Sequence, residues 1–115
     1  VGFDDTARSL AGGRQESNSS GAKSLCDALM TNRPGDITFP INQRLVRGVF
    51  TVSDPMVLAA MAWAWRELKL VVEPGGAAAL AAVLHGPYDC SGKTVGVVLS
   101  GGNVDAGVYA QALGQ

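Results

Sequence analysis

The 115-residue sequence has little charge, few aromatic side chains and few residues that could bind a transition metal. Charged residues make up 17% of the chain and aromatic residues 6%. Because charged residues usually account for about a quarter of a globular chain, this surface has little polar cover, and we expect much of it to face other protein. Nine basic and ten acidic residues give a net charge of −1, which argues against the basic face of a nucleic-acid-binding protein.

The sequence has only two cysteines and one histidine, so few side chains could bind a transition metal or form a disulfide. Cys26 and Cys90 form no CxxC motif and His85 stands alone, so the sequence predicts no zinc site. Two reduced thiols in a cytoplasmic protein are our preferred interpretation, and one disulfide is the alternative. No apolar run of about 20 residues and no signal peptide are present, so we expect no contact with a membrane. Because the first residue is Val rather than Met, we expect a processed or excised chain.

Hydrophobic residues make up 47% of the chain, enough for the core of one small unit. Apolar spacing and helix-end residues predict six helices, and two β-branched runs predict strands. The helices cover residues 4–11, 22–30, 40–47, 54–69, 77–84 and 105–113, and the strands cover 49–52 and 94–99. The second strand is apolar throughout, which is typical of a parallel sheet buried on both faces. The fold class is therefore α/β, and we expect a partial three-layer parallel-sheet domain that is mostly helical.

The predicted helix 54–69 carries apolar side chains in nearly every direction. A helix that is apolar all round is buried on more than one side, which is difficult to arrange in so small a body. We therefore expect a partner subunit or further sequence to cover it. We interpret Trp63 and Trp65 as packing or interface residues rather than as a stacking site for bases.

A glycine-rich turn, Ser100-Gly101-Gly102-Asn103, follows the second predicted strand directly. Ligands of open α/β sheets bind beyond the carboxyl ends of the strands, and glycine lets the backbone approach a ligand closely. Two interpretations are equally supported by the pattern. One is a ligand site, and the other is a tight turn whose glycines only tolerate positive φ.

Three acidic or basic positions have both a functional and a structural interpretation. Glu73 precedes Pro74-Gly75 and is either a carboxylate at a ligand edge or, as the residues favour, a helix-start acid. The adjacent pair Asp4-Asp5 could share a hard cation, but acids at a helix start more often complement the helix dipole. His85 lies in a last helical turn, where a helix-end cation is favoured over a catalytic base.

Several motifs occur together and in one order. Their combination resembles pyridoxal-phosphate enzymes of the fold-type II group, in particular threonine/serine dehydratases (ammonia-lyases) and serine racemases. The resemblance covers nearly all of this chain, but only the C-terminal third or so of such an enzyme. The motifs are Phe3-Asp4-Asp5, Cys26-Asp27-Ala28, the segment from Phe50 to Asp54, the segment from Leu68 to Pro74, and the segment from Val98 to Asp105.

The resemblance implies a role for each motif. Ser100 would hydrogen-bond the pyridine nitrogen of pyridoxal phosphate, with Gly101 in the same turn and Glu73 near the ring. A neutral hydroxyl at that nitrogen leaves the ring a mild electron sink, which favours α,β-elimination over transamination. The resemblance also implies a site for a divalent or monovalent cation at the Asp5 carboxylate, the Phe3 backbone carbonyl and a Glu two residues before the position of Val1, which lies outside this sequence. It makes the metal interpretation of Asp5 as strong as the helix-dipole one.

Important parts of that family's active site do not occur in this sequence. The Schiff-base lysine, the glycine-rich phosphate cradle and the serine opposite the lysine all belong to upstream segments, and Gly75 stands where relatives carry a hydroxyl residue. We therefore expect no catalytic residue in this chain and no activity from the chain alone.

The expected function follows from this resemblance. Residues 1–115 would be the C-terminal part of the large cofactor-binding domain of a dehydratase. The complete enzyme would convert a small β-hydroxy amino acid into a 2-oxo acid and ammonia, and we expect a homo-oligomer. The alternative is a free-standing, non-catalytic oligomeric module for binding or interaction, derived from such a gene.

Overall fold

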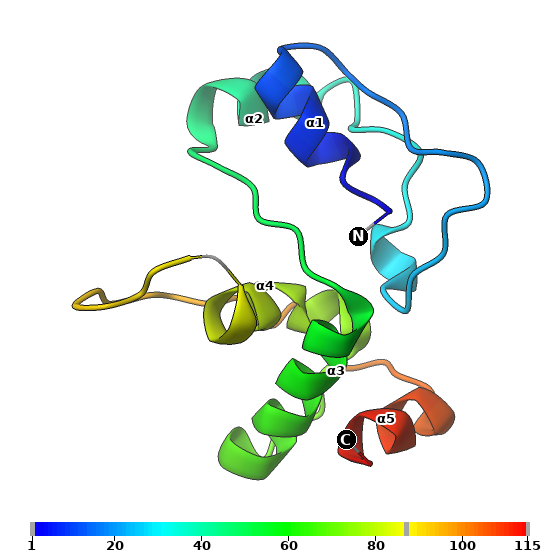
Figure 1. Ribbon diagram of the computed structural model, residues 1–115, viewed down its shortest axis with the longest axis vertical. Helices are drawn as coiled ribbons and strands as arrows, with labels where there is room; N and C mark the ends of the chain where they lie inside the picture. The colour runs from blue at the N-terminus through cyan, green and yellow to red at the C-terminus, as the bar shows by residue number, and fades with distance from the viewer. Residues whose placement is uncertain (1, 87, 115) are drawn as a thin grey trace.

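The computed structural model describes residues 2–86 and 88–114, which form helices joined by long connections (Figure 1). Helices α1 and α2 lie at one end of the molecule, and α3, α4 and α5 lie at the other (Figure 1). The body is flat, with extents of 40 × 39 × 21 Å. No helix in the described ranges is long and apolar enough to span a membrane. The elements in order are α1 (Asp5–Gly12), the 3-10 turn η1 (Asp27–Leu29), α2 (Thr38–Leu45), α3 (Asp54–Trp63), the π-helical turn η2 (Ala64–Leu68), α4 (Pro74–His85) and α5 (Ala106–Leu113).

The core lies where α3 packs against α4 and α5. Alanines supply much of it, because small side chains let helix backbones approach closely. Larger apolar residues, Val57, Leu58 and Met61 on α3, fill the remaining space and are almost fully buried. The alanines with no exposed surface are Ala60, Ala64, Ala77, Ala81 and Ala112.

The start of α3 is tied to an earlier part of the chain by Asp54. Its Oδ1 accepts a hydrogen bond from Ser24 Oγ at 2.7 Å, and its Oδ2 accepts one from the backbone N–H of Leu25 at 3.1 Å. A carboxylate is also favoured at this position by the helix dipole. Asp54 therefore joins the 24–25 segment to the beginning of α3.

The helix predicted over 54–69 forms as α3 and η2 together, and it ends at Lys69 in a left-handed conformation with φ 59°. The helices predicted over 4–11, 40–47, 77–84 and 105–113 also form, with shifted ends. The helix predicted over 22–30 is wrong, because only η1 forms there. The N–H of Leu25 is bound by Asp54 and the N–H of Cys26 by Ser24 Oγ, and such side-chain bonds compete with helix formation.

Both predicted strands, 49–52 and 94–99, are wrong for this chain, since no described residue lies in a β-strand. The two segments run as irregular connections along one side of α4, where Phe50, Val52 and Val95 line a shared pocket. A strand needs a neighbouring backbone to accept and donate its hydrogen bonds, and the described residues place none beside either segment. The second run is not buried on both faces either, because Val98 is 76% exposed. The predicted parallel sheet is therefore not formed by these residues.

The helix predicted to be apolar all round is covered only in part. Its N-terminal half is buried by α4 and α5, whereas its C-terminal end and the following connection remain exposed. Here Trp65 packs edge-on against Tyr109, with ring centroids 6.1 Å apart. We call the exposed part the apolar end of α3, and it comprises Trp63, Trp65, Leu68, Leu70 and Val71.

Candidate functional site

The structure brings Glu73 and the turn at residues 100–103 together. The backbone N–H of Glu73 donates to the carbonyl oxygen of Gly101 at 3.0 Å. In return, the backbone N–H of Asn103 donates to Glu73 Oε2 at 3.1 Å. Glu73 immediately precedes α4, so it couples the start of that helix to a turn far along the chain. Glu73 is therefore a helix-start acid, as the residues favour, and its place at a ligand edge stays a prediction.

Glycines let this turn pack against residues 71–76 with backbone on backbone. A Cβ atom on Gly76 would lie 2.7 Å from the carbonyl oxygen of Gly101, and one on Gly102 would lie 2.6 Å from the carbonyl oxygen of Val71. Neither Gly101 nor Gly102 has positive φ. The interpretation that the turn uses glycine only for positive φ is therefore wrong, and close approach is the reason for glycine here.

Ser100 stands at the exposed edge of this turn. The bonds and contacts to residues 71–76 involve Gly101, Gly102 and Asn103, so they fix the turn on one side. The residues present fit the ring end of pyridoxal phosphate. They offer a neutral hydroxyl on a firmly held turn, which suits a ring nitrogen as hydrogen-bond partner.

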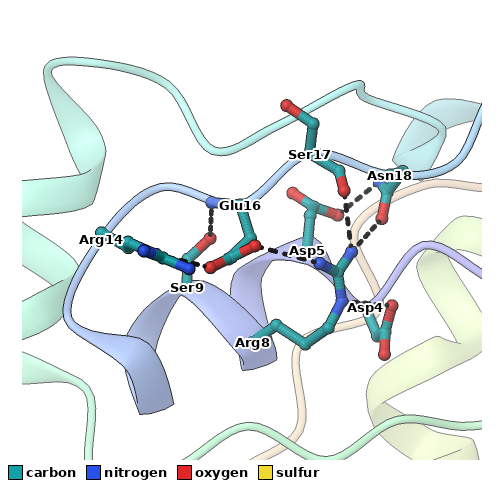
Figure 2. A network of polar contacts seen from close by, with 8 residues as sticks. All are labelled: Asp4, Asp5, Arg8, Ser9, Arg14, Glu16, Ser17 and Asn18. Carbon is teal, nitrogen blue, oxygen red and sulfur yellow. Dashed lines mark hydrogen bonds and ion pairs between the residues drawn. The ribbon is translucent and has the colours of Figure 1, made fainter.

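The second candidate position, Asp5, is the first residue of α1 and is only 3% exposed. Its Oδ1 accepts a hydrogen bond from Asn18 Nδ2 at 2.7 Å, but its Oδ2 is buried and has no partner among the described residues (Figure 2). A buried carboxylate oxygen without a partner is unfavourable, so this atom fits a bound cation.

Such a cation would need oxygen ligands other than clustered acids. Within residues 2–86 and 88–114, no group of three or more His, Cys, Asp or Glu side chains could hold a metal. A hard cation at Asp5 would therefore take backbone carbonyls and water for most of its shell, as magnesium and calcium often do. Phe3 is half-buried and lies two residues before the start of α1, and its carbonyl stays a predicted ligand.

The neighbouring Asp4 is in a different electrostatic situation. Arg8 Nε donates to Asp4 Oδ1 at 3.1 Å, and this hydrogen bond holds the pKa of Asp4 below its ordinary value of 3.8. The same guanidinium lies 3.8 Å from Glu16 Oε2. Asp4 is therefore satisfied by an ion pair at the start of α1, while Asp5 next to it is not.

Sequence reasoning missed Asn18, the partner of Asp5. It lies in the polar loop 14–21, which carries no hydrophobic periodicity and no motif, so nothing in the pattern marked it. The two predicted sites belong to different elements, because Asp5 is the first residue of α1 and Ser100 belongs to the turn that Glu73 holds at the start of α4.

The cysteines and the histidine take no part in either candidate site. Cys26 and Cys90 are both free thiols, in agreement with the preferred interpretation. Burial raises the pKa of the Cys26 thiol above its ordinary value of 9.0. His85 is exposed in the last turn of α4, in agreement with its predicted helix-end position.

The helical body and its serine turn belong to a known class of enzyme. Residues 1–101 match the pyridoxal-phosphate dependent enzyme family, and the chain belongs to that family. The chain is 35% identical to serine racemase of Dictyostelium discoideum over 116 residues, which cover 98% of this chain and 36% of that protein. It is 36% identical to L-threonine ammonia-lyase of Thermotoga maritima over 97 residues, which cover 84% of this chain and 24% of that protein.

Solved structures agree with this assignment. The structure of maize serine racemase matches with a TM-score of 0.83 and 34% identity, covering 97% of this chain and 35% of that one. The structure of serine racemase from Dictyostelium discoideum matches with a TM-score of 0.80 and 36% identity, covering 91% of this chain and 33% of that one. The chain thus spans between about a quarter and about a third of the length of these relatives. The predicted family resemblance is confirmed, and the α/β class holds for these neighbours.

Proposed function

We propose that this chain supplies the ring-nitrogen side of the active site in a pyridoxal-phosphate enzyme that acts on a small β-hydroxy amino acid. Three similar proteins are named serine racemase, L-threonine ammonia-lyase and L-threo-3-hydroxyaspartate ammonia-lyase. Serine, threonine and 3-hydroxyaspartate all carry a hydroxyl on the β carbon. Loss of water across the α and β carbons, followed by release of ammonia and a 2-oxo acid, is the proposed reaction.

The observation that carries this proposal is the exposed Ser100 on a turn held by Glu73. When bound, pyridoxal phosphate supplies the electron sink for bond breaking at the α carbon. Ser100 offers the ring nitrogen a neutral hydroxyl, so no charged group protonates the ring fully. Glu73 and Gly76 keep the turn in place by hydrogen bonding and close packing. In this arrangement Glu73 positions the turn and does not itself need to contact the ring.

We also propose that Asp5, with the carbonyl of Phe3, binds a cation at the start of α1. The buried Oδ2 without a partner supports this part of the proposal.

The second candidate function is a non-catalytic module that associates with itself or with another protein. The apolar end of α3 favours it, since five large apolar residues lie exposed on one connected segment. Association and enzyme function are compatible, because an enzyme subunit also needs its apolar surface covered. A homo-oligomer in the cytoplasm is therefore part of both proposals.

A chimera tests the enzyme proposal directly. The chain would replace the matching segment of the Dictyostelium discoideum serine racemase, and ammonia and 2-oxo acid release would be measured with serine, threonine and 3-hydroxyaspartate. We expect turnover with at least one substrate, and we expect Ser100→Ala to lower it by about 10-fold, the value of one hydrogen bond. Ser91→Ala is the matched control, because Ser91 lies exposed in a loop away from the turn.

The isolated chain with added pyridoxal phosphate provides the negative control, and we expect only background release of ammonia. A soluble chimera that holds the cofactor but turns over none of the three substrates would contradict the enzyme proposal. Clear turnover by the isolated chain would contradict the expectation that it lacks catalytic groups.

A further inference from the structure

Asn18 connects three separate segments through four hydrogen bonds, and Figure 2 shows those to Asp5 and Arg8. Its side-chain Nδ2 donates to Asp5 Oδ1 at 2.7 Å and to the carbonyl oxygen of Thr31 at 2.8 Å. Its Oδ1 accepts from Arg8 Nη2 at 3.1 Å, and its backbone N–H donates to the carbonyl oxygen of Asn32 at 2.8 Å. One residue therefore ties the first turn of α1 to loop 14–21 and, through its side chain and its backbone, to residues 31–32.

These partners allow only one orientation of the Asn18 amide. An amide has two N–H donors on its nitrogen and acceptor lone pairs on its oxygen. A rotation of 180° would turn the oxygen towards the Asp5 carboxylate and the nitrogen towards the Arg8 donor, so both contacts would become repulsive. The orientation of the Asp5 carboxylate is fixed in turn, because its Oδ1 must meet the Asn18 donor.

The guanidinium of Arg8 takes part in the same network but bonds to groups other than the Asp5 carboxylate. Arg8 donates to Asp4 Oδ1, to the backbone carbonyl of Ser17 and to Asn18 Oδ1, each at 3.1 Å (Figure 2). None of these bonds involves Asp5. The result is a carboxylate on a residue only 3% exposed, with one oxygen held by an amide and the other without a described partner.

We infer that Asn18 is a positioning residue that holds the Asp5 carboxylate so that its Oδ2 binds a hard divalent cation. Asn18 does not touch the cation but orients the oxygen that does. This inference deepens the cation proposal made above and rests on it. Residues that orient a metal ligand in this way typically contribute roughly 10- to 100-fold to metal affinity.

The test is a titration of the chain with Mn²⁺, followed by the electron paramagnetic resonance signal of the free ion. We expect Asp5→Asn to abolish binding and Asn18→Ala to weaken it by roughly 10-fold or more. Gln15→Ala is the matched control and should leave the affinity unchanged. Gln15 lies in the same loop and its side-chain amide also makes two hydrogen bonds, to the carbonyl of Pro34 and to Asp36 Oδ1, without touching Asp5.

A second measurement on the unsubstituted chain does not depend on the folding of any variant. Substoichiometric Mn²⁺ should broaden the NMR signals of the Asn18 side-chain amide before those of Gln15, and an excess of Mg²⁺ should reverse the effect. Equal Mn²⁺ affinity of Asn18→Ala and the unsubstituted chain would overturn the positioning role but leave the cation proposal standing. No Mn²⁺ binding by the unsubstituted chain, or no selective broadening at Asn18, would overturn both.

Discussion

At the scale of single residues, the adjacent carboxylates of Asp4 and Asp5 differ in the partners that they find in the fold. Asp4 is paired with Arg8, whereas Asp5 is buried with one oxygen that no described residue satisfies. Glu73 differs again, because its carboxylate accepts the N–H of Asn103 while its own N–H reaches the carbonyl of Gly101. The identity of an acidic residue therefore says less about its role than the groups that meet it across the fold.

The role of Glu73 leads to a prediction about stability. Glu73→Ala should lower the free energy of unfolding by about 1 kcal/mol, because the Asn103 N–H loses a charged acceptor but can still reach water. Glu73→Gln should cost less, since it keeps an acceptor oxygen. Urea unfolding followed by circular dichroism measures both. Glu67→Ala on the exposed face of η2 is the control, and a loss for Glu73→Ala no larger than that of the control would refute the positioning role.

At this scale the sequence is informative where a residue belongs to a motif. The resemblance predicts that Glu73, Ser100 and Gly101 share a site, and the structure brings their segments together. Their contact with a cofactor stays a prediction. Asn18 was not predictable, because its importance comes from side-chain hydrogen bonds across a loop without periodicity, and such bonds depend on the folded arrangement alone.

At the scale of elements, α4 and the turn at 100–103 form one unit through their glycines. The first turn of α4 contains Gly75 and Gly76, which intrinsic helix preference disfavours by about 1 kcal/mol each. Gly76 is nevertheless required, because a Cβ atom there would meet the Gly101 backbone at 2.7 Å. Tertiary packing therefore overrides local propensity at the start of this helix.

Two glycine-to-alanine substitutions should have opposite effects on stability. Gly76→Ala should lower the free energy of unfolding by about 1–3 kcal/mol, because the added methyl group forces backbone atoms apart. Gly107→Ala in α5 should raise it by about 0.5–1 kcal/mol, because no atom lies within 4 Å of the new methyl group and alanine favours a helix. Thermal and urea unfolding of the two variants measure these changes in the free energy of unfolding. A Gly76→Ala variant as stable as the unsubstituted chain would show that the backbone can shift at little cost.

Helices are more predictable than strands in this chain for a physical reason. A helix satisfies its backbone within one segment, so apolar spacing and end residues locate α3, α4 and α5. A strand depends on a neighbour elsewhere in the fold, and 49–52 and 94–99 have β-forming sequences without a paired backbone among the described residues. Local sequence can therefore indicate strand preference but cannot supply the partner.

At the scale of the whole molecule, the surface is large for the mass. A folded chain of this size is expected to expose about 5,900 Å², whereas this chain exposes 7217 Å². The difference is comparable with what one or two partners bury on one chain in a specific interface. The extra exposed surface goes with the flat shape of the molecule, and the apolar end of α3 forms part of it.

Self-association should follow if the apolar end of α3 is an interface between copies. Light scattering should give a mass above the 11.8 kDa of one chain, and the mass should rise with concentration. Leu68→Lys, at a position 46% exposed, should shift the population towards monomer. Ile37→Lys near the other end, at a position 83% exposed, is the control and should not. A monomer at every concentration, or equal effects of both lysines, would contradict this interface.

The carboxylate of Asp54 has a consequence for protein engineering. Asp54 binds both Ser24 and Leu25, so the two ends of the segment between residues 25 and 54 are held together. The entropy of closing a loop grows only with the logarithm of its length, so a segment whose ends are held together tolerates added residues between them. Gly48 lies within this segment, exposed and with no atom within 4 Å of where a side chain would begin. This position suits a genetically inserted tag or reporter domain that leaves the α3–α4–α5 core undisturbed.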